Sequence, residues 1–471
     1  MCEVRRLDLL HSLPSPIYSC ANLIVERLDS RADFQVIIIM SEDPLYRALQ
    51  PEEIRLLTII SIDPTIECLL KVCSLSESSP NWQPYYALSY VWGSQPFSET
   101  ISCNGTPLKI TPSLFDTLKE IFRYNEVYSD QRPVWIDAIC LNQKDFGELE
   151  VQVPLMRNIY SKATIVLVYL GSAQNNSDLA MKSAAALRDK LHETEEPYEL
   201  TSGLAWLPNE KDPIWSAIEH LLARPWFHRV WTFQEVILGK KIRIGCGSSW
   251  LPWKVLAGLF EEFRLKGISI FVDQSTAEKE AGAPAIFPSA IMNQFEWFRA
   301  QYSSGTKLDI PTLLSVCRSR ECKEPVDHLW GILGLLPSEV SDKVRSSAIV
   351  DYSPEGRAHF WNSYITFSKW LIQDSLKHLS MAPSPSKHHM LPSWCPDWTS
   401  IQSNALLLSE LYGCGVGHVE HEVPDRRTRP NCNKISLSGF RIDTIHQVIG
   451  SCPAWNRLPF EPEKSLTEIL Q

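Results

Sequence analysis

Polar side chains of this 471-residue chain stand close to the ends of short apolar runs, where they could bind a ligand or stabilise charge. The first run ends at Ser89 and Tyr90, and the second ends near Asp137. Arg229 and Glu235 follow a third. If these runs are parallel strands of one open sheet, their carboxyl ends meet at the edge where such sheets bind ligands. A carboxylate held there can stabilise positive charge that develops as a bond breaks.

Three more side chains near these ends, Trp92, Asn142 and Trp231, are candidate binding residues. Glu235 is the candidate catalytic group, because its aromatic and apolar neighbours would strengthen the field of a charge held among them. A structural interpretation stays open beside this one. In it the tryptophans pack the sheet edge, Asp137 and Arg229 form an ion pair, and Glu235 satisfies backbone amides at a helix start.

The elements that would position these residues follow an alternating α/β rhythm. Residues 86–91, 134–138 and 164–170 are mostly apolar and are separated by helical patterns, which predicts buried parallel strands lying side by side. Residues 241–246 are a fourth strand candidate. Residues 101–110 predict a hairpin with an Asn-Gly turn, and Thr111 followed by proline predicts a helix start. Val151, Leu155 and Ile159 mark the next helix.

Other segments set the domain organisation. Residues 1–50 are a poorly defined leader in which 36–39 reads as a buried strand, and 51–272 form the α/β core. Within the core, 172–212 are an insertion of a helix plus loops, which we interpret as a solvated surface excursion. Residues 273–290 are a linker, 291–382 are helical, and 393–471 form an irregular tail that tends toward β structure.

Composition excludes several function classes. Acidic residues outnumber basic ones by 55 to 45, so the field of the chain does not favour nucleic acid. The 13 cysteines lack metal-ligand spacing, which predicts reduced thiols and no metal site. No apolar run is long enough to span a bilayer, and the N-terminus lacks the apolar stretch of a signal peptide. We therefore expect a cytoplasmic protein with no resident cofactor.

Four blocks of sequence, taken in order, resemble a known family. They are ALSYVWG at 87–93, WIDAICLNQ at 135–143, RPWFHRVWTFQE at 224–235 and DHLWGILGL at 327–335. Together they are similar to the heterokaryon-incompatibility (HET) domain of filamentous fungi, over roughly residues 52–336. In the fourth block, Glu324, Pro325 and Val326 stand where the family has Asp-Pro-Arg. The resemblance implies self/non-self recognition (allorecognition) and programmed cell death.

A more distant resemblance is to the Toll/interleukin-1-receptor (TIR) domain. Leu88, Ser89 and Tyr90 match its first-strand motif, and Ile136 with Asp137 matches its second strand. The run 231–235 is similar to its Trp-Cys-x-x-Glu helix start, with threonine in place of cysteine. In catalytically active TIR domains that glutamate supports cleavage of the nicotinamide–ribose bond of NAD. The resemblance therefore implies NAD as a substrate and Glu235 as the group that supports its cleavage.

These observations predict an α/β protein with a TIR-like, flavodoxin-like parallel sheet core carrying insertions, then a mostly helical region and an irregular C-terminal tail. The predicted function is that of a fungal incompatibility and cell-death effector acting through NAD cleavage, as an NAD⁺ nucleosidase switched on by assembly. Two alternatives stay open: a non-enzymatic signalling module that binds a protein partner, and a degenerate HET member without death activity. A protein partner or self-assembly is expected, and the sequence names neither partner nor trigger.

Overall fold

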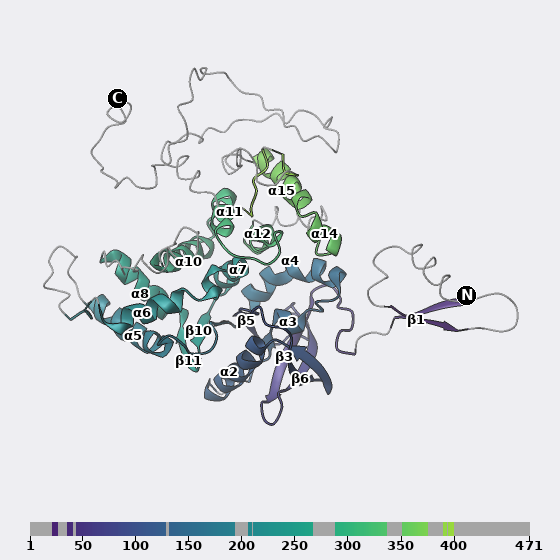
Figure 1. Cartoon of the computed structure of the whole chain (residues 1–471), viewed down its shortest axis with the longest axis horizontal. Coiled ribbons are helices and arrows are strands. Elements are labelled where there is room, and N and C mark those ends of the chain that lie inside the picture. The colour runs from purple at the N-terminus through teal and green to yellow at the C-terminus, as the bar shows by residue number, and fades with distance from the viewer. Residues whose placement is uncertain are drawn as a thin grey trace, which may run out of the picture. The chain divides into compact units, whose positions relative to one another are not determined.

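The structure is a computed structural model, and all the residues that it describes belong to the first of two compact units, Met1–His418 (Figure 1). The second unit, Val419–Gln471, and much of the predicted leader, linker and C-terminal tail lie outside the described residues. The described residues are 21–26, 35–40, 44–128, 131–193, 206–209, 211–266, 288–336, 351–374, 390–392 and 394–399.

Two sheets are formed by the described residues. Strands β1 (Ala21–Glu26) and β2 (Gln35–Met40) pair antiparallel in a two-stranded sheet, so the strand predicted at 36–39 is confirmed. The second sheet has nine strands in the order β11-β10-β9-β5-β8-β3-β4-β6-β7. Its strands are β3 (Glu53–Ser61), β4 (Glu67–Ser74), β5 (Tyr86–Tyr90), β6 (Glu99–Cys103), β7 (Thr106–Ile110), β8 (Val134–Trp135), β9 (Ile165–Tyr169), β10 (Ile242–Cys246) and β11 (Ser249–Pro252).

Four neighbouring strands, β10, β9, β5 and β8, run parallel, and antiparallel strands extend the sheet on both sides. The α/β class and the three predicted parallel neighbours are therefore confirmed, with β5 between β8 and β9. In chain order these four strands lie 2-1-3-4, which is the order of flavodoxin-like sheets. The order reverses between β5 and β9, and in such sheets ligands bind at the carboxyl ends of the two strands that flank this point. The likeness to TIR domains stays a prediction.

Strand β8 is shorter than its sequence suggested. The apolar run 134–138 predicts five strand residues, but β8 ends at Trp135, and Asp137 begins the short helix α3 (Asp137–Cys140). The backbone N–H groups of Ile139 and Cys140 both donate to Ile136 O, at 3.0 and 2.7 Å, which closes a helical turn. Asp137 supports that turn, because its Oδ1 accepts from the Ala138 N–H at 2.7 Å.

The predicted hairpin and helix starts are confirmed. Asn104 and Gly105 join β6 to β7 with φ of 53° and 77°, as the turn requires. Thr111 Oγ1 accepts from the Leu114 N–H at 3.3 Å at the start of α2 (Pro112–Tyr128). Helix α4 (Phe146–Lys162) forms where predicted and buries Ile159, but Val151 is exposed, and Leu149 and Met156 face the core instead.

The interpretation of 172–212 as a solvated excursion is wrong for its described part. Helix α5 (Ser177–Glu193) buries a stripe that includes Ala180, Ala184 and Leu191 and packs on α6 (Pro213–Leu222) and α8 (Trp253–Leu265). Figure 1 shows these three helices together. The acidic run that follows the helix suggested a solvated segment, while small alanines at helical spacing gave only a weak apolar pattern.

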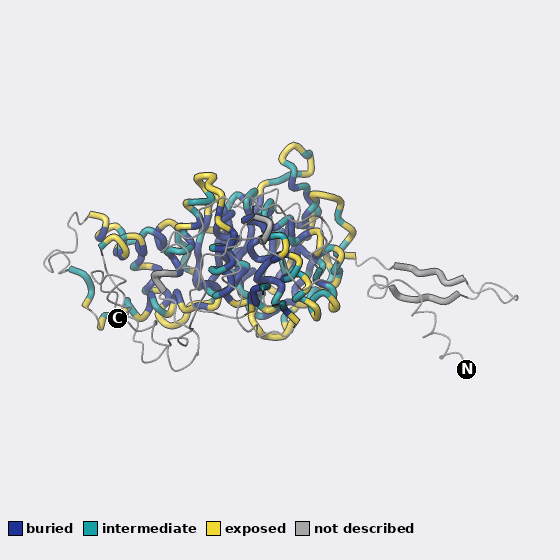
Figure 2. The backbone as a smooth tube through the Cα atoms, turned by 90° about the horizontal axis from the view of Figure 1, so that it is seen from above, coloured by how far each residue is buried: buried dark blue, intermediate teal, exposed yellow. Residues whose placement is uncertain are grey.

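Outside the sheet, helix α7 (Val230–Leu238) is packed against several other helices. Helix α10 (Pro288–Ser303) contacts both α7 and α8, and α4 also contacts α7. Figure 2 shows the buried residues gathered in the interior, with exposed segments around them. Within the region predicted to be helical at 291–382, the block at 327–335 forms two separate short turns. The remaining short or C-terminal helices are η2 (Pro225–His228), α11 (Ile310–Arg318), α12 (Asp327–Trp330), η3 (Leu333–Leu335), α14 (Pro354–Ala358) and α15 (Trp361–Asp374).

Candidate functional site

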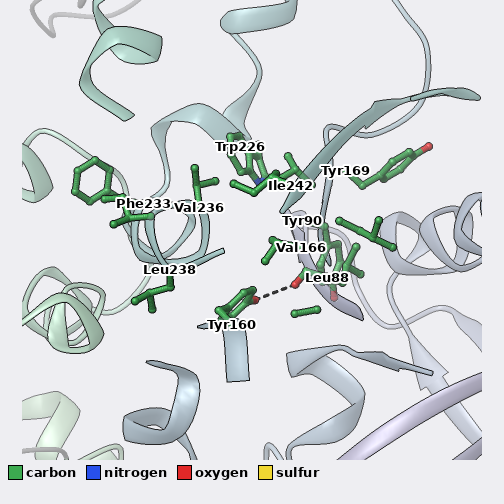
Figure 3. Close-up of a cluster of buried hydrophobic side chains, with 14 of the residues drawn as sticks. Leu88, Tyr90, Tyr160, Val166, Tyr169, Trp226, Phe233, Val236, Leu238 and Ile242 are labelled. Carbon is green, nitrogen blue, oxygen red and sulfur yellow. Dashed lines mark hydrogen bonds between the residues drawn. The ribbon is translucent and has the colours of Figure 1, made fainter. Parts of the chain in front are cut away.

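The carboxyl end of β5 is completed by side chains from other elements. Tyr86 N–H donates to Pro133 O, so the backbone polar groups of Tyr86, and by alternation those of Leu88 and Tyr90, face β8. Because β8 ends at Trp135, the Leu88 and Tyr90 carbonyls have no strand beside them. The Tyr160 hydroxyl donates to Leu88 O at 2.9 Å (Figure 3), and Arg229 Nη1 donates to Tyr90 O at 2.7 Å.

Ser89 ties the strand end to the block that contains Arg229 and Glu235. Trp226 Nε1 donates to Ser89 Oγ at 2.9 Å, and both residues are buried. Trp226 is held in turn by aromatic packing, because its ring stacks on Phe295 with centroids 5.8 Å apart. Since the serine hydroxyl already accepts one hydrogen bond, its own proton is free to be donated, and it is donated to the Glu235 carboxyl.

Glu235 is a buried carboxyl without a full set of partners. It is 6% exposed, Ser89 and Tyr160 hydrogen-bond to it, and its Oε2 is buried with no hydrogen-bond partner among the described residues. Burial, together with the negative charge of Asp137, raises the pKa of Glu235 to about 7. The hydrogen bonds and the Arg229 cation oppose that rise. Glu235 is therefore able to change charge near neutral pH.

Asp137 stands at the end of β8 with Trp92 against it. Trp92 Nε1 donates to both carboxylate oxygens, at 3.1 and 2.9 Å, and the Ala138 N–H donates to Oδ1. Burial raises the pKa of Asp137, while Arg229, Trp92 and the amide lower it. Arg229 acts on this carboxyl through its charge, because its hydrogen bond goes to Tyr90 O. Trp92 and Asp137 thus form one hydrogen-bonded pair at the sheet edge.

A second buried carboxyl, Asp327, also interacts with the charge of Arg229. Tyr352 donates to Asp327 Oδ1 at 3.0 Å, and Trp231 also hydrogen-bonds to this carboxyl. Burial raises the pKa of Asp327 to about 6, and Arg229 lowers it. The Arg229 cation therefore shares its field among the carboxyls of Asp137, Glu235 and Asp327.

The glycines of the block at 327–335 let it lie directly on α7. A Cβ at Gly331 would stand 2.7 Å from Val230 Cγ1, and one at Gly334 would stand 2.7 Å from Gln234 Oε1. The Gly334 N–H donates to that same Gln234 oxygen at 3.0 Å. Val230 and Gln234 are four residues apart on one face of α7, so the two glycines fix the helix that carries Glu235.

The loop between α3 and α4 is anchored by a separate buried ion pair. Arg55 Nη1 and Nη2 contact the two oxygens of Glu148 at 2.6 and 2.9 Å, and Arg55 also donates to Cys140 O. The Asn142 N–H donates to Glu148 at 2.8 Å, and its side-chain oxygen accepts from the Lys144 N–H. Asn142 therefore holds this loop, and among the described residues its hydrogen bonds go to this anchor and to Lys144.

The structure brings together Ser89, Asp137, Arg229 and Glu235, with Tyr90 and Trp92 beside them. Trp231 faces Asp327 instead. The open interpretation of Glu235 as a helix-start cap is wrong, because Glu235 lies inside α7, five positions after its first residue. Sequence reasoning missed Tyr160 and Asp327 as members of the cluster. Tyr160 carries a hydroxyl on the mostly apolar buried face of α4, which is a signal that could have found it.

Comparison with known proteins places part of the chain in a family. The family model for Heterokaryon incompatibility protein (HET) matches residues 85–235, which begin just before β5 and end at Glu235. This segment is a HET domain. The chain is also 27% identical over 419 residues to Heterokaryon incompatibility protein 6, OR allele, of Neurospora crassa. That match covers 77% of this chain and 59% of the relative, so the chain spans little more than half of the relative's length. No solved structure matches the chain.

The matched HET segment is shorter than the resemblance predicted at 52–336, and the block at 327–335 lies outside it. The segment nevertheless contains Ser89, Asp137, Tyr160, Arg229 and Glu235, so the polar cluster belongs to the HET domain apart from Asp327. Among the described residues, no helix is long and apolar enough to cross a membrane. No group of three or more His, Cys, Asp or Glu side chains in the described part of the chain is arranged to hold a metal ion.

Proposed function

We propose that this protein is a fungal incompatibility effector whose HET domain cleaves the nicotinamide–ribose bond of NAD, with Glu235 as the catalytic carboxylate. The observation that supports this most is the buried Glu235 carboxyl, one oxygen of which has no partner among the described residues, beside β5 near the point where the strand order reverses. The relative's name, a heterokaryon incompatibility protein, supports the biological setting. Cell death would follow from loss of NAD.

The proposed reaction consumes water. The bond between C1′ of the ribose and the nicotinamide nitrogen breaks, and its electron pair goes to the nitrogen, which neutralises the pyridinium. Positive charge then develops on C1′ and O4′, where the ionised Glu235 would stabilise it. Water adds to C1′ and loses a proton, which leaves nicotinamide, ADP-ribose and H⁺. Arg229 is the cation in the cluster that could bind the diphosphate.

The burial of Glu235 favours a second candidate, the non-enzymatic module. At 6% exposure the carboxyl lies under neighbouring side chains, so a substrate reaches it only when these move. In this alternative the cluster holds the β5 end together, and the domain acts by binding a protein partner or another copy of itself. NAD cleavage that begins only on assembly would reconcile the buried resting state with the enzyme.

Two experiments test the proposal. Purified full-length protein is incubated with NAD at pH 8, alone and concentrated to promote assembly, and nicotinamide release is followed by chromatography. Separately, wild type and Glu235→Gln are expressed in a fungal host to equal protein levels, and growth and cellular NAD are measured. We expect nicotinamide release, slowed growth and NAD loss from the wild type only. Slow growth with normal NAD in both strains would support the module and contradict the enzyme.

A further inference from the structure

Tyr160 contacts two acceptors at the end of β5. It lies in the last turn of α4 and is 1% exposed, and its ring meets Trp135 edge-on with centroids 5.6 Å apart. Its hydroxyl donates to Leu88 O at 2.9 Å, as Figure 3 shows, and also hydrogen-bonds with the Glu235 carboxyl. A tyrosine hydroxyl has one proton, so it cannot donate to both acceptors at once.

The two protonation states of Glu235 therefore need different hydrogen bonds. When Glu235 is protonated, it can donate to the Tyr160 oxygen while Tyr160 donates to Leu88 O, and every group is satisfied. When Glu235 is ionised, Tyr160 is the donor that can approach it from α4, since Ser89 approaches from β5. Leu88 O then loses its donor, because β8 ends too early to supply one. The charge of Glu235 is thus coupled to the end of β5.

We propose that Tyr160 is the positioning residue of this site, which holds the Glu235 carboxyl by sharing one hydroxyl proton between Leu88 O and the carboxyl. The inference rests on the proposed function where it concerns catalysis. In the reaction, Tyr160 orients the ionised carboxyl toward the ribose by donating to one of its oxygens, and it does not itself touch the substrate.

Every charged or titratable group that faces Glu235 bears on its titration. Ser89 and Tyr90 approach from β5, Asp137 from α3, and Arg229 from the start of α7 itself. Asp137 disfavours the ionised form, while Arg229, Ser89 and Tyr160 favour it. Removing the Tyr160 hydroxyl takes away one of the groups that favour ionisation, so Glu235 should then ionise only at higher pH.

The test compares Tyr160→Phe with Tyr85→Phe in the full-length chain. Tyr85 is a matched control, because its buried hydroxyl donates to Ile159 O at 2.7 Å, one residue from Tyr160, and burial alone raises its pKa, with no contribution from Glu235. Two readouts are taken from pH 5 to 9. One is the rate of nicotinamide release, and the other is unfolding stability in urea, which reports the Glu235 titration without catalysis.

We expect Tyr160→Phe to move the acid limb of the rate profile upward by roughly one pH unit, with near wild-type rates at pH 9. The inflection of the stability profile should move in the same direction. Tyr85→Phe should lower stability without moving either midpoint. Equal midpoints in both variants would overturn the inference and leave Tyr160 a packing residue. If the wild type releases no nicotinamide, the proposed function fails, and the stability profile alone supports or overturns the pairing of Tyr160 with Glu235.

Discussion

Two buried glutamates of this protein lie in opposite environments. Glu148 receives both terminal nitrogens of Arg55, at 2.6 and 2.9 Å, and the Asn142 N–H as well. Glu235 receives two hydroxyls and keeps one oxygen without a partner among the described residues. A fully paired carboxylate holds its loop in one state. A partly paired one stays able to change charge or to bind something else, which is why we assign structure to Glu148 and function to Glu235.

Breaking the paired site should have the largest effect on stability. Arg55→Ala leaves the Glu148 charge buried and unpaired, so we expect a loss of about 3–5 kcal/mol in the free energy of unfolding. Urea denaturation measures it. Arg47→Ala is the control, because Arg47 is 54% exposed, pairs with Glu53 at 3.4 Å and should cost less than about 1 kcal/mol. Equal losses in the two variants would show that the Arg55 pair does not anchor the fold.

The partly paired carboxyl of Glu235 should make the free energy of unfolding depend on pH. Burial raises the pKa of Glu235 from 4.5 to about 7, so between these values the folded protein binds a proton that the unfolded chain releases. Stability should therefore be highest below pH 4.5 for this group and fall by roughly 3 kcal/mol as pH rises to about 7.

Glu235→Gln should flatten that fall. Asp327→Asn should flatten only the part below about pH 6, because burial raises the pKa of Asp327 to about 6. Urea titrations across pH 4–8 measure both. A slope that is the same in wild type and Glu235→Gln would show that Glu235 is ionised throughout, as a fully paired carboxylate would be.

A smaller loss of stability should follow from adding a side chain at Gly331, where the backbone packs directly on α7. Gly331→Ala places a Cβ 2.7 Å from Val230 Cγ1 and 2.9 Å from Asp327 O, so we expect a loss of about 1–3 kcal/mol. Gly147→Ala is the matched control, since its Cβ would meet only Asp145 Oδ1 at 3.4 Å, and a helical alanine is favoured over glycine. Thermal unfolding compares them, and a neutral Gly331→Ala would contradict close docking on α7.

The sequence predicted the parallel strands well, because each strand is a short apolar run bounded by a glycine or a proline, and such a pattern is visible in the local sequence. The sequence overestimated the length of β8, because that strand ends where the helical turn at Asp137 begins, although the apolar run continues. The convergence of Ser89, Asp137, Arg229 and Glu235 followed from the rule that parallel strands share one carboxyl edge.

Other features of the site depend on contacts between distant segments. The binding role of Asn142 stays a prediction, and its backbone is held by Glu148, six residues further along the chain. Tyr160 joined the cluster only because α4 passes over a strand end that β8 leaves bare. Asp327 joined it because two glycines allow α12 and η3 to pack on α7. The hydroxyl of Tyr160 on a helix face that is mostly apolar hints at a buried polar contact, but which group it meets depends on how distant segments pack.

The central claim, that Glu235 is the functional carboxylate of this HET domain, is tested most directly by the rate of nicotinamide release at pH 8 by wild type and Glu235→Gln. Glutamine keeps the shape and loses the charge, so we predict a fall of about 100-fold or more. The free energy of unfolding should be equal or higher, since no charge remains buried. A variant that cleaves NAD within a few-fold of the wild-type rate would contradict the account.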